Sequence, residues 1–152
     1  MVEEQLNSLI AQWDGTLINR YTHLANAAAY LYSITETINW LGFYLIDEEN
    51  NRLVLGPFQG SSACIEIPMG KGVCGTAAVK KESIRVADVH HFEGHIVCDS
   101  VSESELVLPL FDSHGEVVGV LDIDSPIKNR FTEEDQKNFE GYAAIISSAL
   151  WT

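Results

Sequence analysis

Two pairs of apolar segments, each joined by a short polar turn, limit this chain to folds that contain an antiparallel sheet. The first pair, "NWLGFYLIDEE" and "NRLVLGPF", meets at Asn50-Asn51. The second pair, "ELVLPLFDSHGEVVGVLDID", turns at Ser113-His114-Gly115. Asn and Gly between alternating apolar runs are typical of β-hairpins, and strands joined as hairpins form antiparallel sheets.

Helices and further strands are predicted around these hairpins. Apolar residues recur at helical spacing over residues 3–13 and 16–32, and "GVCGTAAVKK" indicates a short helix. The segments "ACIEI" and "SIRVAD" have the pattern of strands. Thr132, with Asp135 at position N3, is the predicted N-cap of a last helix. We therefore predict an α+β domain with a six-stranded antiparallel sheet, flanked by N- and C-terminal helices.

Length and charge indicate one domain, residues 1–152, outside any membrane. No apolar run approaches the roughly 18 residues of a membrane span, and the N-terminus "MVEEQLNSLI" lacks the basic region of a signal peptide. The formal net charge of −13 repels nucleic acid and anionic lipid, and attracts a ligand that carries an ammonium group. We expect a cytoplasmic protein with no nucleic-acid or membrane partner.

The chain has three cysteines, Cys64, Cys74 and Cys98. A disulfide framework is not expected in a reducing compartment, and an odd number of cysteines fits one badly. With the histidines of the irregular 89–104 segment they could form a Cys3His zinc set, but no C-x-x-C pair is present, so we predict no metal. Each cysteine could also be an inert packing residue, an interpretation that fits Cys64 in "ACIEI" best.

A redox pair is the other interpretation of the cysteines. Two of them lie on a strand–turn–helix corner, and Cys98 lies on the 89–104 segment, which could fold over that corner. The N-terminus of the predicted helix favours a thiolate at Cys74, whereas Asp99 disfavours one at Cys98. The local sequence therefore leaves open which thiol attacks.

The glycines around Cys74 match G-x-G-x-x-G at Gly70, Gly72 and Gly75. The helix that follows is too short for the crossover of a dinucleotide-binding unit, and the excess of acidic residues disfavours a nucleotide. We predict a tight turn with backbone amides facing the site, and no bound cofactor.

Strand "GEVVGVLDID" places Asp122 and Asp124 on one face of the sheet. Together with Glu105 on the partner strand, they would repel one another, raise a pKa, and bind a cation or donate a proton. A solvated strand end before Ser125-Pro126 explains the same residues equally simply. Trp40 is a candidate for the apolar wall of a pocket, or an ordinary core residue.

Three stretches resemble the free methionine-R-sulfoxide reductases, a family built on a single GAF domain: "GPFQGSSACIEIPMGKGVCGTA", "VADVHHFEGHIVCDSVSESELVLPL" and "GVLDIDSPIKNRF". The resemblance covers essentially the whole chain. It implies that Cys98 is the catalytic nucleophile and Cys64 the main resolving cysteine. Cys74 is implied to be a second thiol that is required less uniformly.

The resemblance also implies the remaining site residues and the electron donor. Glu105, Asp122 and Asp124 correspond to acidic residues of the pocket that bind substrate and take part in catalysis, and Trp40 to the residue that packs on the substrate methyl group. The turn before Cys74 is implied to contribute amides for the substrate carboxylate. No cofactor is implied; reduced thioredoxin, linked to NADPH, would regenerate the thiols.

The alternative from another class is a GAF regulatory module that binds a small ligand and needs no cysteines. GAF domains often pair through their terminal helices, so a homodimer is expected as one option, with Trp13 and Trp151 as candidate contacts. Burial of both tryptophans within one chain fits the sequence equally well.

Overall fold

The six strands form one antiparallel sheet in the order β3-β2-β1-β6-β5-β4. The computed structural model describes residues 1–152. Its strands are β1 (Trp40–Asp47), β2 (Arg52–Gly60), β3 (Glu66–Pro68), β4 (Ile84–Val86), β5 (Ser104–Phe111) and β6 (Val117–Ser125). Its helices are α1 (Val2–Ile10), α2 (Leu17–Ile34), α3 (Gly72–Lys80), α4 (Glu133–Leu150) and a short 3₁₀ helix, η1 (Val89–His91). The predicted α+β class and six-stranded antiparallel sheet are confirmed.

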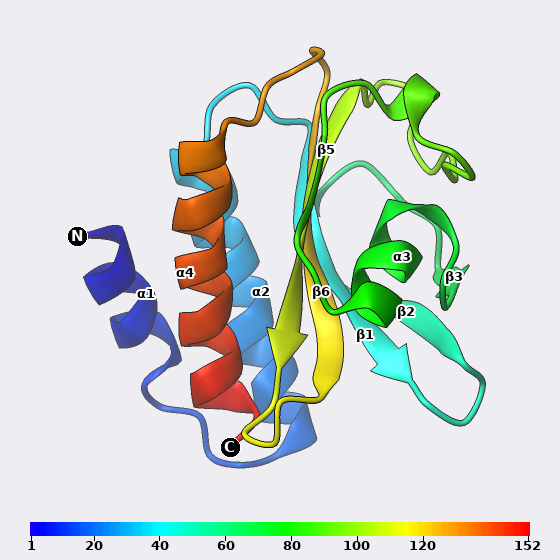
Figure 1. The fold of residues 1–152 in the computed structure, drawn as a ribbon. Coiled ribbons are helices and arrows are strands. Elements are labelled where there is room, and N and C mark those ends of the chain that lie inside the picture. The colour runs from blue at the N-terminus through cyan, green and yellow to red at the C-terminus, as the bar shows by residue number, and fades with distance from the viewer.

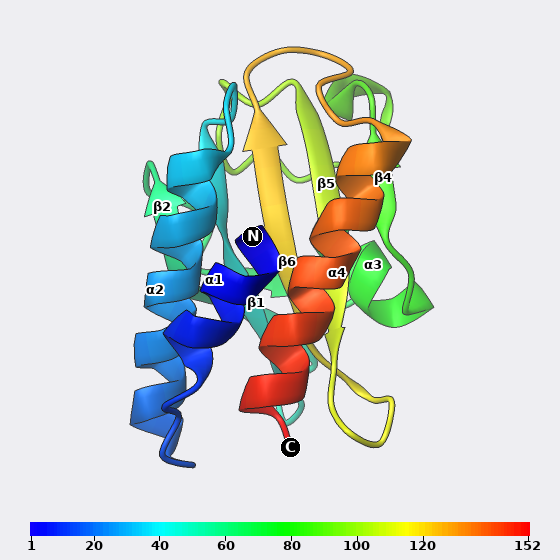
Figure 2. The same cartoon turned by 90° about the vertical axis from the view of Figure 1, so that its left-hand side faces the viewer.

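Helices cover both faces of the sheet (Figure 1). The terminal helices α1, α2 and α4 lie together on one face, which Figure 2 shows from the front, and α3 lies on the other with the 89–104 segment. Strand alternation divides the apolar residues accordingly. Leu41 and Phe43 of β1 face the terminal helices, whereas Trp40 and Tyr44 belong to the core under α3. No helix is long and apolar enough to cross a membrane.

The helix ends follow local sequence signals with one exception. Thr132 and Asp135 form the predicted capping box, in which each side chain accepts a hydrogen bond from the other residue's backbone amide. The first helix ends at Ile10, so the prediction of a helix through residue 13 is wrong. Trp13 lies beyond the helix, where its ring packs against the core under the terminal helices.

The two candidate dimer contacts have a partner within the chain. The guanidinium of Arg20 lies 5.0 Å from the ring centroid of Trp13 and 4.8 Å from that of Trp151. Arg20 Nε also donates a hydrogen bond to the carbonyl of Leu150 at 2.7 Å. Such cation–π contacts account for both tryptophans in a monomer, and the homodimer stays a prediction.

Gly42 of β1 is required by the packing of the aromatic residues next to it. It pairs with Asp122 of β6 and Phe58 of β2. A Cβ atom at this position would overlap Cβ of Phe58 and lie 2.8 Å from Cη2 of Trp40. The Trp40 and Phe58 rings stack with centroids 5.2 Å apart, so an added methyl group would force these two side chains apart.

We expect Gly42→Ala to lower the free energy of unfolding by about 1–3 kcal/mol, the usual cost of overpacking. Gly141→Ala is the matched control, because a Cβ there meets only the end of the Glu3 side chain, at 3.3 Å. It lies inside α4, where replacing Gly by Ala stabilises a helix by up to about 1 kcal/mol. Urea unfolding measures both, and equal effects of the two substitutions would contradict the packing argument.

Candidate active site

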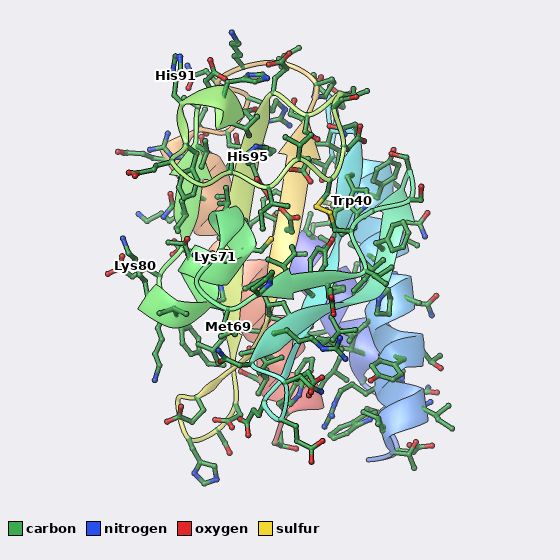
Figure 3. The ribbon with its side chains drawn as sticks, turned by 90° about the vertical axis from the view of Figure 1, so that its right-hand side faces the viewer. Trp40, Met69, Lys71, Lys80, His91 and His95 are labelled. Carbon is green, nitrogen blue, oxygen red and sulfur yellow. A yellow bond between two sulfur atoms is a disulfide. The ribbon has the colours of Figure 1, made fainter.

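A small cavity of about 40 Å³ lies between the sheet and the layer formed by α3 and the 89–104 segment. The sheet contributes Trp40, Glu105, Asp122 and Asp124, and the start of α3 contributes Cys74. The 89–104 segment covers these residues with His95 and Cys98. Figure 3 views this face, with Trp40 and His95 labelled and the disulfide in yellow beside Trp40. All seven predicted site residues are thus close together: six of them line the cavity, and Cys64 is bonded to one of the six, Cys98.

The disulfide joins Cys64 to Cys98, with their Cα atoms 5.2 Å apart. It connects the segment before β3 to the 89–104 segment, and both cysteines are half-buried. The interpretation of Cys64 as an inert packing residue is therefore wrong. Cys64 precedes β3, which is shorter than "ACIEI" predicted, so this cysteine lies outside the strand. A Cys3His zinc set is also ruled out in this state, because two of its cysteines are bonded to each other.

Asp99 forms a second connection between the two cysteine-bearing segments. Its Oδ2 accepts hydrogen bonds from Ser61 Oγ at 2.8 Å and Asn39 Nδ2 at 3.1 Å, and its Oδ1 accepts one from the Val101 amide at 3.0 Å. These bonds, first that from Val101, lower the pKa of Asp99. Asp99 is therefore an ionised clasp beside Cys98, a role the sequence did not reveal because its partners are distant in the chain.

Trp40 and Tyr44 form a fixed wall below the disulfide. Their rings stack with centroids 5.9 Å apart. Trp40 Nε1 donates a hydrogen bond to the carbonyl of Ser61 at 3.0 Å, and the Tyr44 hydroxyl donates one to the carbonyl of Cys64 at 2.8 Å. Both aromatic residues therefore also hold the segment that carries Cys64, a role sequence analysis missed for Tyr44.

The three acidic residues lie on the sheet face below α3, as alternation predicted. Register places Asp124 between Trp40 on β1 and Glu105 on β5. Asp122 and Glu105 are buried and Asp124 is half-buried, so a solvated strand end is the wrong interpretation. Oδ1 of Asp122 is buried and has no hydrogen-bond partner. Because Asp122 lines the cavity, this oxygen is a candidate hydrogen-bonding atom for a ligand.

These carboxyl groups favour their protonated forms. Burial, followed by repulsion from Asp124, raises the pKa of Asp122 to about 8. Burial also raises the pKa values of Glu105 and Asp124 well above the ordinary range, with added repulsion from Asp122 on Glu105 and from Glu105 on Asp124. No lysine or arginine pairs with them. His95 Nε2 lies 3.9 Å from Glu105 Oε1, and burial lowers the pKa of His95, which favours the neutral imidazole. The cluster can donate protons and lacks a cation.

Cys74 is the buried, unpaired thiol. Its Sγ lies 4.0 Å from Glu105 Oε2. Burial, and then the charges of the three neighbouring carboxyls, raise its pKa. This outcome is the opposite of the thiolate expected from the helix N-terminus, because one helix end does not compensate for three buried acids.

Two groups of side chains have donor atoms close enough for a metal ion. The donors of Cys74, Glu105 and Asp122 lie within 4.8 Å of one another, as do those of Asp88, His90 and Glu103. In the first group a metal would have to displace the protons that burial favours. In the second, Lys128 Nζ already lies 3.3 Å from Asp88. Neither group changes the prediction of no metal.

The start of α3 presents backbone amides to the cavity. Gly70 and Gly72 have φ values of 81° and 63°, which other residues rarely adopt, so they form the predicted tight turn. The amides of Gly72, Val73 and Cys74 are the first three of the helix and have no backbone acceptor. These residues line the cavity. The amides and the helix dipole suit an anionic group such as a carboxylate.

Known proteins share this architecture over most of the chain. A family model described as "GAF domain" matches residues 24–150. The free methionine-R-sulfoxide reductase of Escherichia coli is 50% identical over 129 residues, which cover 85% of this chain and 76% of that protein. The structure of fRMsr of Staphylococcus aureus in its reduced form has a TM-score of 0.89 and 46% identity, and covers 98% of this chain and 92% of that chain.

A second solved structure was determined with a ligand. The free methionine-R-sulfoxide reductase of Neisseria meningitidis, in complex with its substrate, matches with a TM-score of 0.90 and 40% identity. The match covers 98% of this chain and 86% of that chain. Sequence identity of 40–50% over 85–98% of the chain assigns it to one subfamily of proteins with this fold. The chain therefore belongs to the GAF domain family and, within it, to the free methionine-R-sulfoxide reductases.

Proposed function

We propose that this protein is an enzyme that reduces free methionine-R-sulfoxide to methionine by thiol chemistry. One observation carries the proposal: the Cys64–Cys98 disulfide lies against a cavity that is lined by Trp40 and by the three acidic side chains Glu105, Asp122 and Asp124. A ligand-binding GAF module needs neither a disulfide nor this acid cluster. Family membership supports the same activity, since relatives of the chain carry its name.

The cavity has a complement for each part of the substrate. Free methionine sulfoxide is a zwitterion with an S-methyl group and a basic sulfoxide oxygen. The ammonium group supplies the cation that the cluster of Glu105, Asp122 and Asp124 lacks, so part of the cluster ionises against it. A carboxyl that stays protonated donates to the oxygen. Trp40 suits the methyl group, and the first amides of α3 suit the carboxylate. A peptide-bound methionine has neither free charge.

The reaction proceeds in two steps within the chain. The Cys98 thiolate attacks the sulfoxide sulfur while a protonated carboxyl of the cluster donates to the oxygen. Methionine leaves, and Cys98 retains the oxygen as a sulfenic acid. The thiol of Cys64 then attacks the Cys98 sulfur, water leaves, and the disulfide forms. Thioredoxin, itself reduced with NADPH, returns both cysteines to thiols by exchange, and no bound cofactor is needed.

The oxidised form is closed to substrate. Its cavity of about 40 Å³ is far smaller than the roughly 150 Å³ that accommodate benzene in an engineered cavity, and methionine sulfoxide is larger than benzene. The 89–104 segment is held over the cavity by the disulfide and by Asp99. Reduction of the disulfide therefore precedes substrate entry, because it frees Cys98 to move away with its segment.

The activity is tested by NADPH oxidation coupled through thioredoxin reductase and thioredoxin. We expect turnover with the free R-sulfoxide and little with the S epimer or with a peptide that contains methionine sulfoxide. The physical reason is that only the free R form presents its ammonium, carboxylate and oxygen to the three complements at once. Binding of a small ligand without NADPH oxidation would instead support a regulatory GAF module.

The cysteine roles are separated by a single-turnover experiment on prereduced protein without reductant. We expect Cys98→Ser to release no methionine, because no sulfenic acid can form. Cys64→Ser should release about one methionine per chain and then stall. Cys74→Ser is the control: its thiol is outside the disulfide, so repeated turnover with thioredoxin should continue at a reduced rate. Normal turnover by Cys98→Ser would overturn the assignment.

Protonation of the cluster is tested through stability. Between the ordinary Asp value and about 8, the unfolded chain loses a proton that folded Asp122 keeps, so the folded state loses stability as pH rises. Asp122→Asn removes this effect. Its free energy of unfolding relative to the parent should therefore increase from pH 5 to 7.5 by up to about 1.4 kcal/mol per pH unit.

Asp112→Asn is the control for this measurement. Backbone hydrogen bonds from Glu116 and His114 lower the pKa of Asp112, so it stays ionised over that range in both states. Urea unfolding at both pH values should therefore give a constant difference for Asp112→Asn. A constant difference for Asp122→Asn as well would mean that Asp122 ionises normally in the folded protein.

A further inference from the structure

We propose that three exposed apolar side chains on the two segments that the disulfide joins, Ile65, Val97 and Val101, form the docking surface for a protein dithiol oxidoreductase. This inference rests on the proposed function, in which such a partner must return Cys64 and Cys98 to thiols. We call these three side chains the apolar collar. They are 75%, 67% and 54% exposed, respectively.

Two members of the collar are direct neighbours of the reactive cysteines in the chain. Ile65 follows Cys64 and Val97 precedes Cys98, and consecutive Cα atoms lie about 3.8 Å apart. The Cα atoms of the two cysteines are 5.2 Å apart. Both apolar side chains therefore begin within a few ångströms of the bridge, on the two segments that it joins.

Besides the disulfide, hydrogen bonds hold two members of the collar, Ile65 and Val101, in place. The carbonyl of Ile65 accepts a hydrogen bond from the Leu55 amide of β2 at 3.0 Å. The Val101 amide donates to Asp99 Oδ1 at 3.0 Å. Asp99 also bonds to Ser61, on the segment that carries Cys64. A surface fixed in this way loses little conformational freedom when a partner binds.

Disulfide exchange explains why a partner must touch this surface. The partner's thiolate attacks one sulfur of the half-buried bridge and forms a mixed disulfide, and the other cysteine leaves as a thiolate. The partner's second thiolate then breaks the mixed disulfide, so two electrons pass from the dithiol to Cys64 and Cys98. Each attack needs a sulfur atom at contact distance, which brings the surfaces around both reactive sites together.

The character of the collar selects the class of partner. The chain carries a formal charge of −13, so a charged small thiol or an acidic protein gains nothing from the long-range field. Contact between uncharged apolar surfaces supplies the attraction instead. The partner is therefore a protein whose reactive dithiol lies in an apolar face, such as thioredoxin, rather than a small anionic thiol such as glutathione.

The test compares two reductants on the double variant Ile65→Ser/Val97→Ser. With thioredoxin and its reductase, we expect the KM for thioredoxin to rise at least tenfold. With dithiothreitol, which needs no docking surface, the rate of methionine formation should be unchanged. The matched control is Leu17→Ser/Ile18→Ser, which removes similarly exposed apolar residues from α2 on the opposite side of the sheet and should change neither reaction.

Each other outcome overturns the proposal in a recognisable way. An unchanged KM for thioredoxin means that the collar is not its docking surface. Equal losses with both reductants mean that Ile65 and Val97 act through the site itself and not through docking of the reductant. A dimer of the parent chain that the double variant loses, measured by light scattering, assigns the collar to a second copy. No methionine from the parent chain with dithiothreitol would contradict the proposed function and not the collar alone.

Discussion

Three carboxyl groups, two buried and one half-buried, lie on one face of the sheet with no lysine or arginine beside them, and the rest of this structure depends on this constraint. A buried, unpaired carboxylate costs several kcal/mol, and protonation avoids most of that cost. The opposite face of the sheet offsets the remaining cost of burying these acids, because it packs a continuous apolar core against α1, α2 and α4. Alternation along β6 builds both faces at once, because Leu121 and Ile123 point into that core while Asp122 and Asp124 point away from it.

The same constraint explains why the cavity needs a cover. Carboxyls open to water would ionise at their ordinary pKa values and could not hold protons near neutral pH. The 89–104 segment and α3 exclude that water, and the disulfide and Asp99 hold the segment in place. In the disulfide-bonded form, the bridge between the two cysteines therefore helps to keep the acids buried beneath the 89–104 segment.

Local patterns predicted the scaffold well, and the contacts between distant segments poorly. The hairpins, the capping box at Thr132 and the shared face of Asp122 and Asp124 depend on neighbours in sequence or on strand alternation, so they could be predicted. The family resemblance was needed to connect Cys64 with Cys98, since 34 residues separate them. The Asp99 clasp and the raised pKa of Cys74 depend on tertiary packing, which no local pattern encodes.

The disulfide also changes how firmly the whole molecule is held together. A bridge that closes a loop of 34 residues removes enough freedom from the unfolded chain to contribute roughly 3–4 kcal/mol. That amount is a large share of the stability of an ordinary domain. An enzyme of this kind would alternate between a tighter and a looser form in every catalytic cycle. A mixture of the two forms would then unfold in two thermal transitions, and their relative sizes would report, without any label, what fraction of the molecules is oxidised.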